Sequence, residues 1–149
     1  MNKLPKLDEH LCFGLYSASR AMTGAYQEFL IKLGLTYPQY LVLLTLWEKD
    51  GENVSSIGKR LFLDSATLTP LLKRLEARGF VERRRSAEDE RVVQVFLTRA
   101  GKRLERQALT LTEAVFCKMN LSLTEIGALR DTLRALTNHL HAIEEQKAG

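Results

Sequence analysis

Cysteine is scarce in this chain of 149 residues, where Cys12 and Cys117 are the only two. Two cysteines cannot build the disulfide framework of a small secreted domain, so we expect a cytoplasmic, normally reduced protein. Long hydrophobic runs are also lacking, and no apolar stretch approaches the roughly 18 residues that a membrane span needs. The apolar stretch 11–18 follows Asp8 and Glu9 and is periodic, which favours a helix start over a signal peptide.

Potential metal ligands are equally sparse. Of the three histidines, His139 and His141 are two positions apart, so they point to different faces of a helix. We therefore expect neither a metal site nor a cofactor. Repeats and low-complexity segments are absent as well. A hydrophobic content of 45% is enough for a core, so the length fits one domain or one domain with appendages.

Positive charge is present, and it is concentrated. The chain carries a net charge of +4, and residues 53–98 hold nine Lys and Arg against six Asp and Glu, a net +3. A local basic excess favours a polyanion as partner, because binding phosphate releases condensed counterions.

Hydrophobic periodicity and capping residues predict helices on both sides of this basic segment. A helix is expected from about residue 7 to 33, ended by Gly34, and another from a capping box at Thr36 and Gln39 to about residue 49. Further on, Thr98 caps a long helix to about residue 120, and a capping box at Ser122 opens a last helix.

Residues 53–98 themselves read as a DNA-binding unit. A short helix from about 55 to 62 precedes a helix from Asp64 to about 78, and two strands follow at 80–85 and 92–97. This order predicts a mainly α protein with a small β-hairpin wing, a winged helix-turn-helix that binds double-stranded DNA.

The amphipathic helices outside this unit predict a homodimer. We assign residues 7–35 and 99–147 to a helical dimerisation region, because their apolar stripes are of the kind that meets a second chain. Two-fold symmetry would match a pseudo-palindromic operator.

The helix that begins after Asp64 is the expected recognition helix. Its core face carries four leucines, and short hydroxyl groups on the other side suit close approach to base edges, with basic residues placed for phosphates. An ordinary exposed helix face is the alternative interpretation. The candidate DNA-binding residues here are Ser65, Thr67, Thr69, Lys73 and Arg74.

The hairpin supplies the other DNA-binding candidates. Arg83, Arg84 and Arg85 lead into its loop, and Asp89 stands two residues before Arg91, close enough to brace it. A braced arginine at a hairpin tip suits a narrow minor groove, although basic hairpins are often only solvated surface.

These motifs resemble the multiple-antibiotic-resistance regulator (MarR) family. The resemblance rests on the segment Asp64–Leu75, on Asp89-Glu90-Arg91 and on Leu97-Thr98, and it covers nearly the whole chain. It implies a dimeric, mostly repressing transcription factor that releases DNA when a ligand or an oxidant acts on it.

Cys12 is the next residue of interest. Tyr16 lies one helical turn after it on the same face, whereas Tyr26 lies fourteen residues on, about 21 Å along a straight helix. Cys12 and Tyr26 could meet only if the first helices of two subunits pack antiparallel. A small buried hydrophobe is the alternative role of Cys12. Hydroxyls of Tyr16, Tyr26 and Tyr37 are candidates to stabilise its thiolate.

The positions of Cys12, Tyr26, Tyr37 and Cys117 resemble a subgroup of that family, the two-cysteine organic hydroperoxide resistance regulators. This resemblance implies that Cys12 reacts with peroxide, that Tyr26 and Tyr37 of the other subunit hydrogen-bond it, and that Cys117 resolves the product as a disulfide. The apolar neighbours of Cys12 would favour an organic peroxide.

Two other functions are open. The same fold could be released by a reversibly bound phenolic or carboxylic ligand, with Cys12 merely buried. A thiol peroxidase is the other, but it would leave the basic hairpin without a role, so we do not expect an enzyme.

Overall fold

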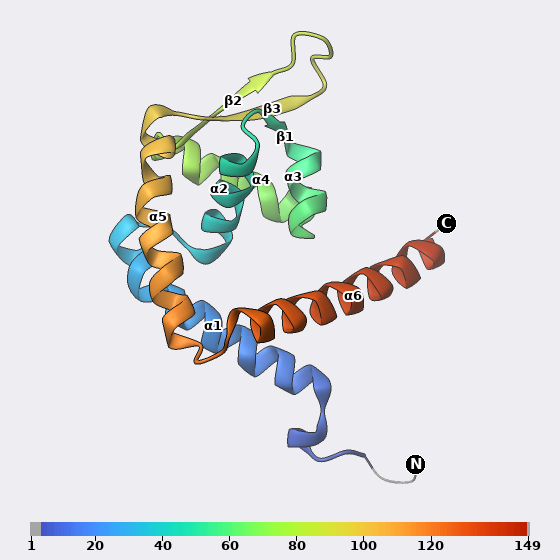
Figure 1. Ribbon diagram of the computed structural model, residues 1–149. Helices are drawn as coiled ribbons and strands as arrows, with labels where there is room; N and C mark the ends of the chain where they lie inside the picture. Colours follow the sequence, from blue (N-terminus) through green and yellow to red (C-terminus); the bar gives the residue numbers. More distant parts are fainter. Residues whose placement is uncertain (1–3, 149) are drawn as a thin grey trace. The chain divides into compact units, whose positions relative to one another are not determined.

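The computed structural model describes residues 4–148 and shows a mainly helical chain with one small antiparallel sheet (Figure 1). The described chain divides into two compact units, one ending at Val115 and the other starting at Phe116. The elements in chain order are a 3₁₀ helix η1 (Leu7–Glu9), α1 (Leu11–Leu33), α2 (Tyr37–Glu48), β1 (Glu52–Asn53), α3 (Val54–Leu61), α4 (Ser65–Ala77), β2 (Val81–Arg85), β3 (Val93–Leu97), α5 (Arg99–Lys118) and α6 (Leu123–Ala148).

The first helix begins later than the sequence predicts. Residues Leu7–Glu9 form a separate 3₁₀ turn, because the Glu9 carboxylate accepts a hydrogen bond from the Lys6 amide at 2.9 Å. His10 then has extended backbone with φ −81° and ψ 119°. The predicted end is confirmed: Gly34 has a left-handed φ of 64°, the conformation that glycine adopts without strain.

Helix α2 provides much of the core of the first unit. Its predicted capping box is confirmed, since the Thr36 amide donates to the Gln39 side chain at 2.9 Å and the Gln39 amide donates back to the Thr36 hydroxyl. Val42, Leu43 and Leu46 on this helix are fully buried. The element is therefore fixed at its start by local bonds and along its length by burial.

The winged helix-turn-helix is present with one strand more than predicted. Asn53 caps α3 and Asp64 caps α4, each through a carbonyl or carboxylate oxygen that accepts an amide at 2.7 Å. The sheet order is β1-β3-β2, and the pairs Glu52↔Val95 and Val81↔Leu97 set its register. The prediction of two strands missed β1, because two residues are too short for a period-two pattern.

The base of the sheet joins α5 through a very close backbone approach. Gly101 is buried, and the indole Nε1 of Trp47 donates to its carbonyl at 3.0 Å. The Thr98 hydroxyl accepts the Gly101 amide at 3.1 Å and donates to the Gly79 carbonyl at 2.6 Å. Any Cβ at Gly101 would overlap the carbonyl oxygen of Phe80, so this junction depends on glycine.

The second unit consists mainly of α6. The predicted capping box is confirmed here too, with the Ser122 amide donating to the Glu125 carboxylate at 2.8 Å. Along the described part of this helix no side chain is fully buried. The large apolar side chains that are exposed on α6 are Leu123, Leu129, Leu133, Leu140 and Ile143.

No single helix of the described chain has the length and apolar composition of a membrane span. Only α1 and α2 taken together reach that composition, and the pair is bent by 78°.

Candidate DNA-binding surface and thiol region

Helix α4 separates a buried face from an exposed one, as the sequence predicts. Leu68, Leu72 and Leu75 are buried, and Leu71 is half-buried. Of the five candidate DNA-binding residues on α4, Thr69 is half-buried, whereas the exposed ones are Ser65, Thr67, Lys73 and Arg74. The hydroxyls of the first turn and the cations of the third turn are thus available to a ligand outside the chain.

An ion pair fixes the angle between α4 and the hairpin. Glu76 accepts two hydrogen bonds from the Arg83 guanidinium at 2.9 and 2.6 Å and one from the Arg83 amide at 3.0 Å. These bonds hold the pKa of Glu76 below its usual value. Arg83 is half-buried here, so it braces α4 instead of extending the basic tip with its neighbours.

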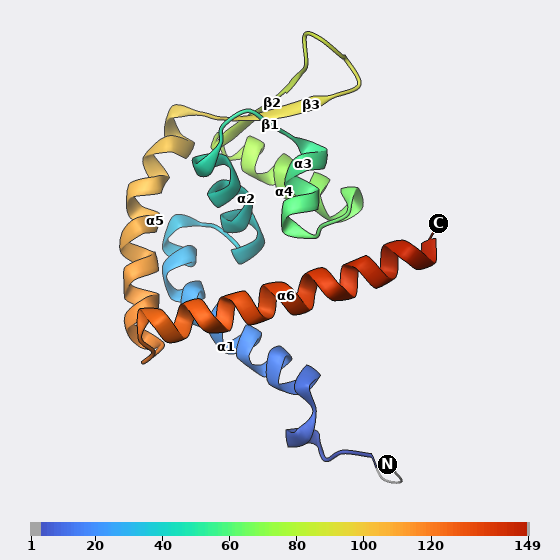
Figure 2. The same ribbon diagram turned by 45° about the vertical axis from the view of Figure 1, so that its right-hand side comes forward.

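The hairpin loop projects beyond the helices of the first unit in both views (Figure 1 and Figure 2). Asp89 Oδ1 accepts bonds from the Arg91 amide at 3.0 Å and from its Nε at 3.3 Å. The Arg91 side chain is nevertheless 92% exposed. The expected brace between Asp89 and Arg91 is therefore formed, and it leaves the cation available for contact.

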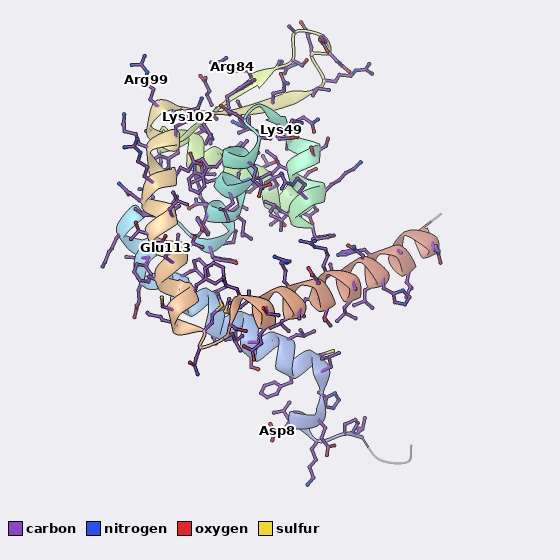
Figure 3. The ribbon with its side chains drawn as sticks, viewed as in Figure 1. Asp8, Lys49, Arg84, Arg99, Lys102 and Glu113 are labelled. Carbon is purple, nitrogen blue, oxygen red and sulfur yellow. The ribbon has the colours of Figure 1, made fainter. Side chains whose placement is uncertain are left out.

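The other two hairpin arginines are exposed but engaged. Arg84 pairs with Glu82, and its guanidinium lies 4.9 Å from the centre of the Phe96 ring. Arg85 donates to the Glu90 carbonyl at 3.4 Å and so helps to shape the loop. The bonds of Arg84 are on the solvent side of β2 (Figure 3).

Cys12 lies in the first turn of α1 and is exposed. This agrees with a reactive thiol better than with the alternative of a small buried hydrophobe. Tyr16 is 58% exposed, and its hydroxyl accepts a hydrogen bond from Arg20 at 3.4 Å. Figure 3 marks the nearby Asp8 at the end of the first unit opposite to Arg84, so the thiol and the hairpin are far apart in one chain.

Tyr26 and Tyr37 lie together in a different place from Cys12. Their ring centres are 5.3 Å apart, and the ring of Tyr40 is 5.7 Å from that of Tyr26. Burial, followed by the neighbouring hydroxyls of Tyr40 and Tyr37, raises the pKa of Tyr26 to about 12. Burial also raises the pKa of Tyr37. Both hydroxyls therefore keep their protons at neutral pH and are able to donate hydrogen bonds.

Cys117 is exposed near the end of α5, at the start of the second unit. Sequence reasoning missed the third tyrosine of the aromatic cluster, Tyr40, and the brace from Glu76 to Arg83. Opposite charges seven residues apart across the turn at Gly79 were the one signal for that brace.

A basic, exposed recognition helix beside a projecting hairpin defines a winged-helix DNA-binding protein. Residues 25–108 match the family model described as "Transcriptional regulator SarA/Rot". The chain is 51% identical over 91% of its length to 70% of the HTH-type transcriptional regulator TtmR of Methylorubrum extorquens. It is 44% identical over 91% of its length to 92% of the organic hydroperoxide resistance transcriptional regulator of Bacillus subtilis.

Solved structures agree. Reduced AbfR bound to DNA, a protein of Staphylococcus epidermidis, is 40% identical with a TM-score of 0.73, covering 90% of this chain and 94% of that one. Disulfide-formed AbfR is 38% identical with a TM-score of 0.62, covering 93% and 92%. The chain belongs to the MarR family of winged-helix transcriptional regulators, most like its organic hydroperoxide resistance regulators. Its relatives are DNA-binding regulators and not enzymes.

Proposed function

We propose that this protein is a redox-sensing repressor that releases its operator when an organic hydroperoxide oxidises Cys12. The observation that carries the proposal is an exposed thiol at the start of α1, in a chain 44% identical to an organic hydroperoxide resistance regulator. The relative AbfR has been solved both reduced on DNA and in a disulfide form. The alternative, release by a bound phenolic or carboxylic ligand, is not favoured by these relatives.

The protein acts as a homodimer in this proposal. The exposed leucines of α6 and the exposed apolar residues of α1, such as Leu11 and Ile31, have no partner within their own unit that would bury them. A second copy would bury them across a two-fold axis, and the same axis fits a pseudo-palindromic operator. As a DNA-binding regulator it would work in the cytoplasm, where the DNA of its bacterial relatives lies.

The thiol site is shared between subunits. Cys12 and Tyr26 stand about 21 Å apart along one helix, so the tyrosines that approach Cys12 come from the partner. The protonated hydroxyls of Tyr26 and Tyr37 donate to the thiolate, while Tyr16 lies on the same face of α1 as Cys12. Hydrogen bonds to the charged form favour the thiolate, which is the nucleophile.

The chemistry follows from thiol reactivity. The Cys12 thiolate attacks one peroxide oxygen, the O–O bond breaks, and the alkoxide leaves and takes up a proton as the alcohol. Cys12 is then a sulfenic acid. The Cys117 thiol of the other subunit condenses with it, which forms the S–S bond and releases water. The hydroperoxide is the oxidant throughout.

DNA is read by two elements. In α4, Ser65, Thr67 and Thr69 face base edges, whereas Lys73 and Arg74 contact phosphates. In the hairpin, Arg84 and Arg85 contact the backbone, and Arg91, held by Asp89, enters the minor groove. Residues 53–98 thus form the DNA-binding domain, and residues 7–35 and 99–147 the dimerisation region.

The hairpin contact predicts a loss of affinity in Arg91→Ala. Because the side chain is 92% exposed, removing it should leave the fold unchanged. Operator affinity should fall about tenfold, and the salt dependence should flatten by about one unit of slope for each site lost. Fluorescence anisotropy at several salt concentrations measures both. Glu88→Ala, on the same loop, is the matched control, and an unchanged affinity and slope in Arg91→Ala would reject the contact.

Oxidation of the wild-type dimer should weaken operator binding and join the two chains. Adding cumene hydroperoxide to the operator complex should release the DNA, and dithiothreitol should restore binding. Peptide mass spectrometry of the oxidised sample should find Cys12 linked to Cys117 between chains, and Cys117→Ser should leave Cys12 open to over-oxidation. DNA that stays bound would contradict the function. A cross-link found only within single chains would contradict the two-cysteine step alone.

A further inference from the structure

Two helix ends meet at one guanidinium in the first unit. Helix α1 ends at Leu33, and α4 ends at Ala77 with Arg78 as its C-cap. The Arg78 side chain donates a hydrogen bond to the Leu33 carbonyl at 3.3 Å. A helix C-terminus carries unpaired carbonyls and partial negative charge, so a cation is favoured there.

The neighbours of Arg78 make room for it and hold it in place. Gly34 has a left-handed φ of 64°, and a Cβ at that position would overlap the Arg78 guanidinium nitrogens. On the other side, the guanidinium carbon lies 5.0 Å from the centre of the Phe80 ring, a distance at which a cation is attracted to an aromatic face. The guanidinium is therefore held between the end of α1 and the first residue after the α4 turn.

The backbone of Arg78 belongs to the end of the recognition helix. Its amide donates to the Arg74 carbonyl at 3.2 Å, and the next amide, of Gly79, donates to the Glu76 carbonyl at 2.8 Å. Glu76 in turn holds Arg83 on β2. A shift of the C-terminus of α1 thus acts on α4 and on the hairpin through a single side chain.

We propose that Arg78 couples α1, the helix that carries the sensing thiol, to the recognition helix. The coupling rests on the proposed function for its redox role. In the reduced protein the bond from Arg78 to Leu33 holds α4 in its DNA-binding position. When oxidation at Cys12 displaces α1, the same bond passes the displacement to the end of α4. Arg78 is a positioning residue in this scheme and does not contact DNA.

The first test compares the operator Kd of oxidised and reduced protein. In Arg78→Ala the ratio of the two values should be at least about threefold smaller than in wild type, while the rate of Cys12 oxidation stays the same. Arg78→Lys, which keeps a cation, should retain part of the ratio. Lys32→Ala, which removes a cation from the same helix end, is the matched control and should keep all of it. An unchanged ratio in folded Arg78→Ala, checked by its Tm, would overturn the proposal.

A second test needs no peroxide, because coupling between two sites is reciprocal. Operator DNA at saturation should change hydrogen exchange of the Gly34 and Leu35 amides, which bond to the Ile31 and Leu30 carbonyls at 2.9 and 2.8 Å. The change should be lost in Arg78→Ala and kept in Lys32→Ala. No change in wild type, or the same change in Arg78→Ala, would overturn the coupling. If peroxide fails to release wild-type DNA while this change is seen, the proposed function fails and the coupling stands.

Discussion

Cys12→Ser should bind the operator with wild-type affinity and keep it in the presence of organic hydroperoxide. Cys12 is exposed, so replacing sulfur by oxygen costs little stability. A serine hydroxyl stays protonated at neutral pH and does not attack a peroxide as a thiolate does. The shift in Kd on oxidation, at least about tenfold if the wild-type switch has the usual size of an allosteric coupling, should vanish.

Operator titrations before and after cumene hydroperoxide measure this effect, with Cys117→Ser as the matched control. That variant keeps the first oxidation step, so its Cys12 should still form the sulfenic acid, detected by a dimedone adduct. DNA release from Cys12→Ser on peroxide treatment would remove Cys12 from the sensing role. It would leave the family assignment and the DNA-binding surface untouched.

Gly101→Ala should destabilise the first unit by about 3 kcal/mol, at the upper end of what overpacking costs. A Cβ at this position meets the carbonyl oxygen of Phe80 and, at 3.1 Å, a methyl group of Leu97. The Phe80 oxygen is backbone and accepts the Thr98 amide at 3.1 Å, so it cannot rotate away as a side chain would. The helix and the base of the sheet must separate instead.

Urea unfolding at one fixed protein concentration measures the loss, because a dimer's midpoint depends on concentration. Gly14→Ala is the matched control: it also lies within a helix, and a Cβ there meets nothing within 4 Å. This control should stabilise the chain by about 0.5–1 kcal/mol, since alanine loses less backbone entropy than glycine. Equal midpoints for the two variants would show that the close approach at Gly101 carries no strain.

Local features were predictable because the groups that interact are three or four residues apart. The caps at Thr36, Asp64 and Ser122 each pair a side chain with an amide in the following turn, and so does the brace from Asp89 to Arg91 over two residues. The core leucines of α4 follow helical spacing for the same reason. The exposure of Cys12 and the grouping of Tyr26 with Tyr37 were beyond this reach, since neither has a local pattern.

Where a distant segment supplies the partner, the sequence was silent or misleading. Strand β1 exists only because Glu52 and Asn53 pair with β3, some forty residues later. Arg83 looked like its exposed neighbours until Glu76 bound it, and the early start predicted for the first helix missed the turn that Glu9 closes at Lys6.

The sequence by itself determined the winged helix-turn-helix, the family and the residues of the DNA-binding surface, because helix caps, turn glycines and apolar spacing act over a few residues and the family's motifs are contiguous. Only the tertiary structure decided that Gly101 admits no side chain and that Arg78 reaches from the end of α4 to the end of α1. Those contacts join residues 21 and 45 positions apart, as Phe80 to Gly101 and Leu33 to Arg78. Packing of the whole unit, and not any local propensity, sets such distances.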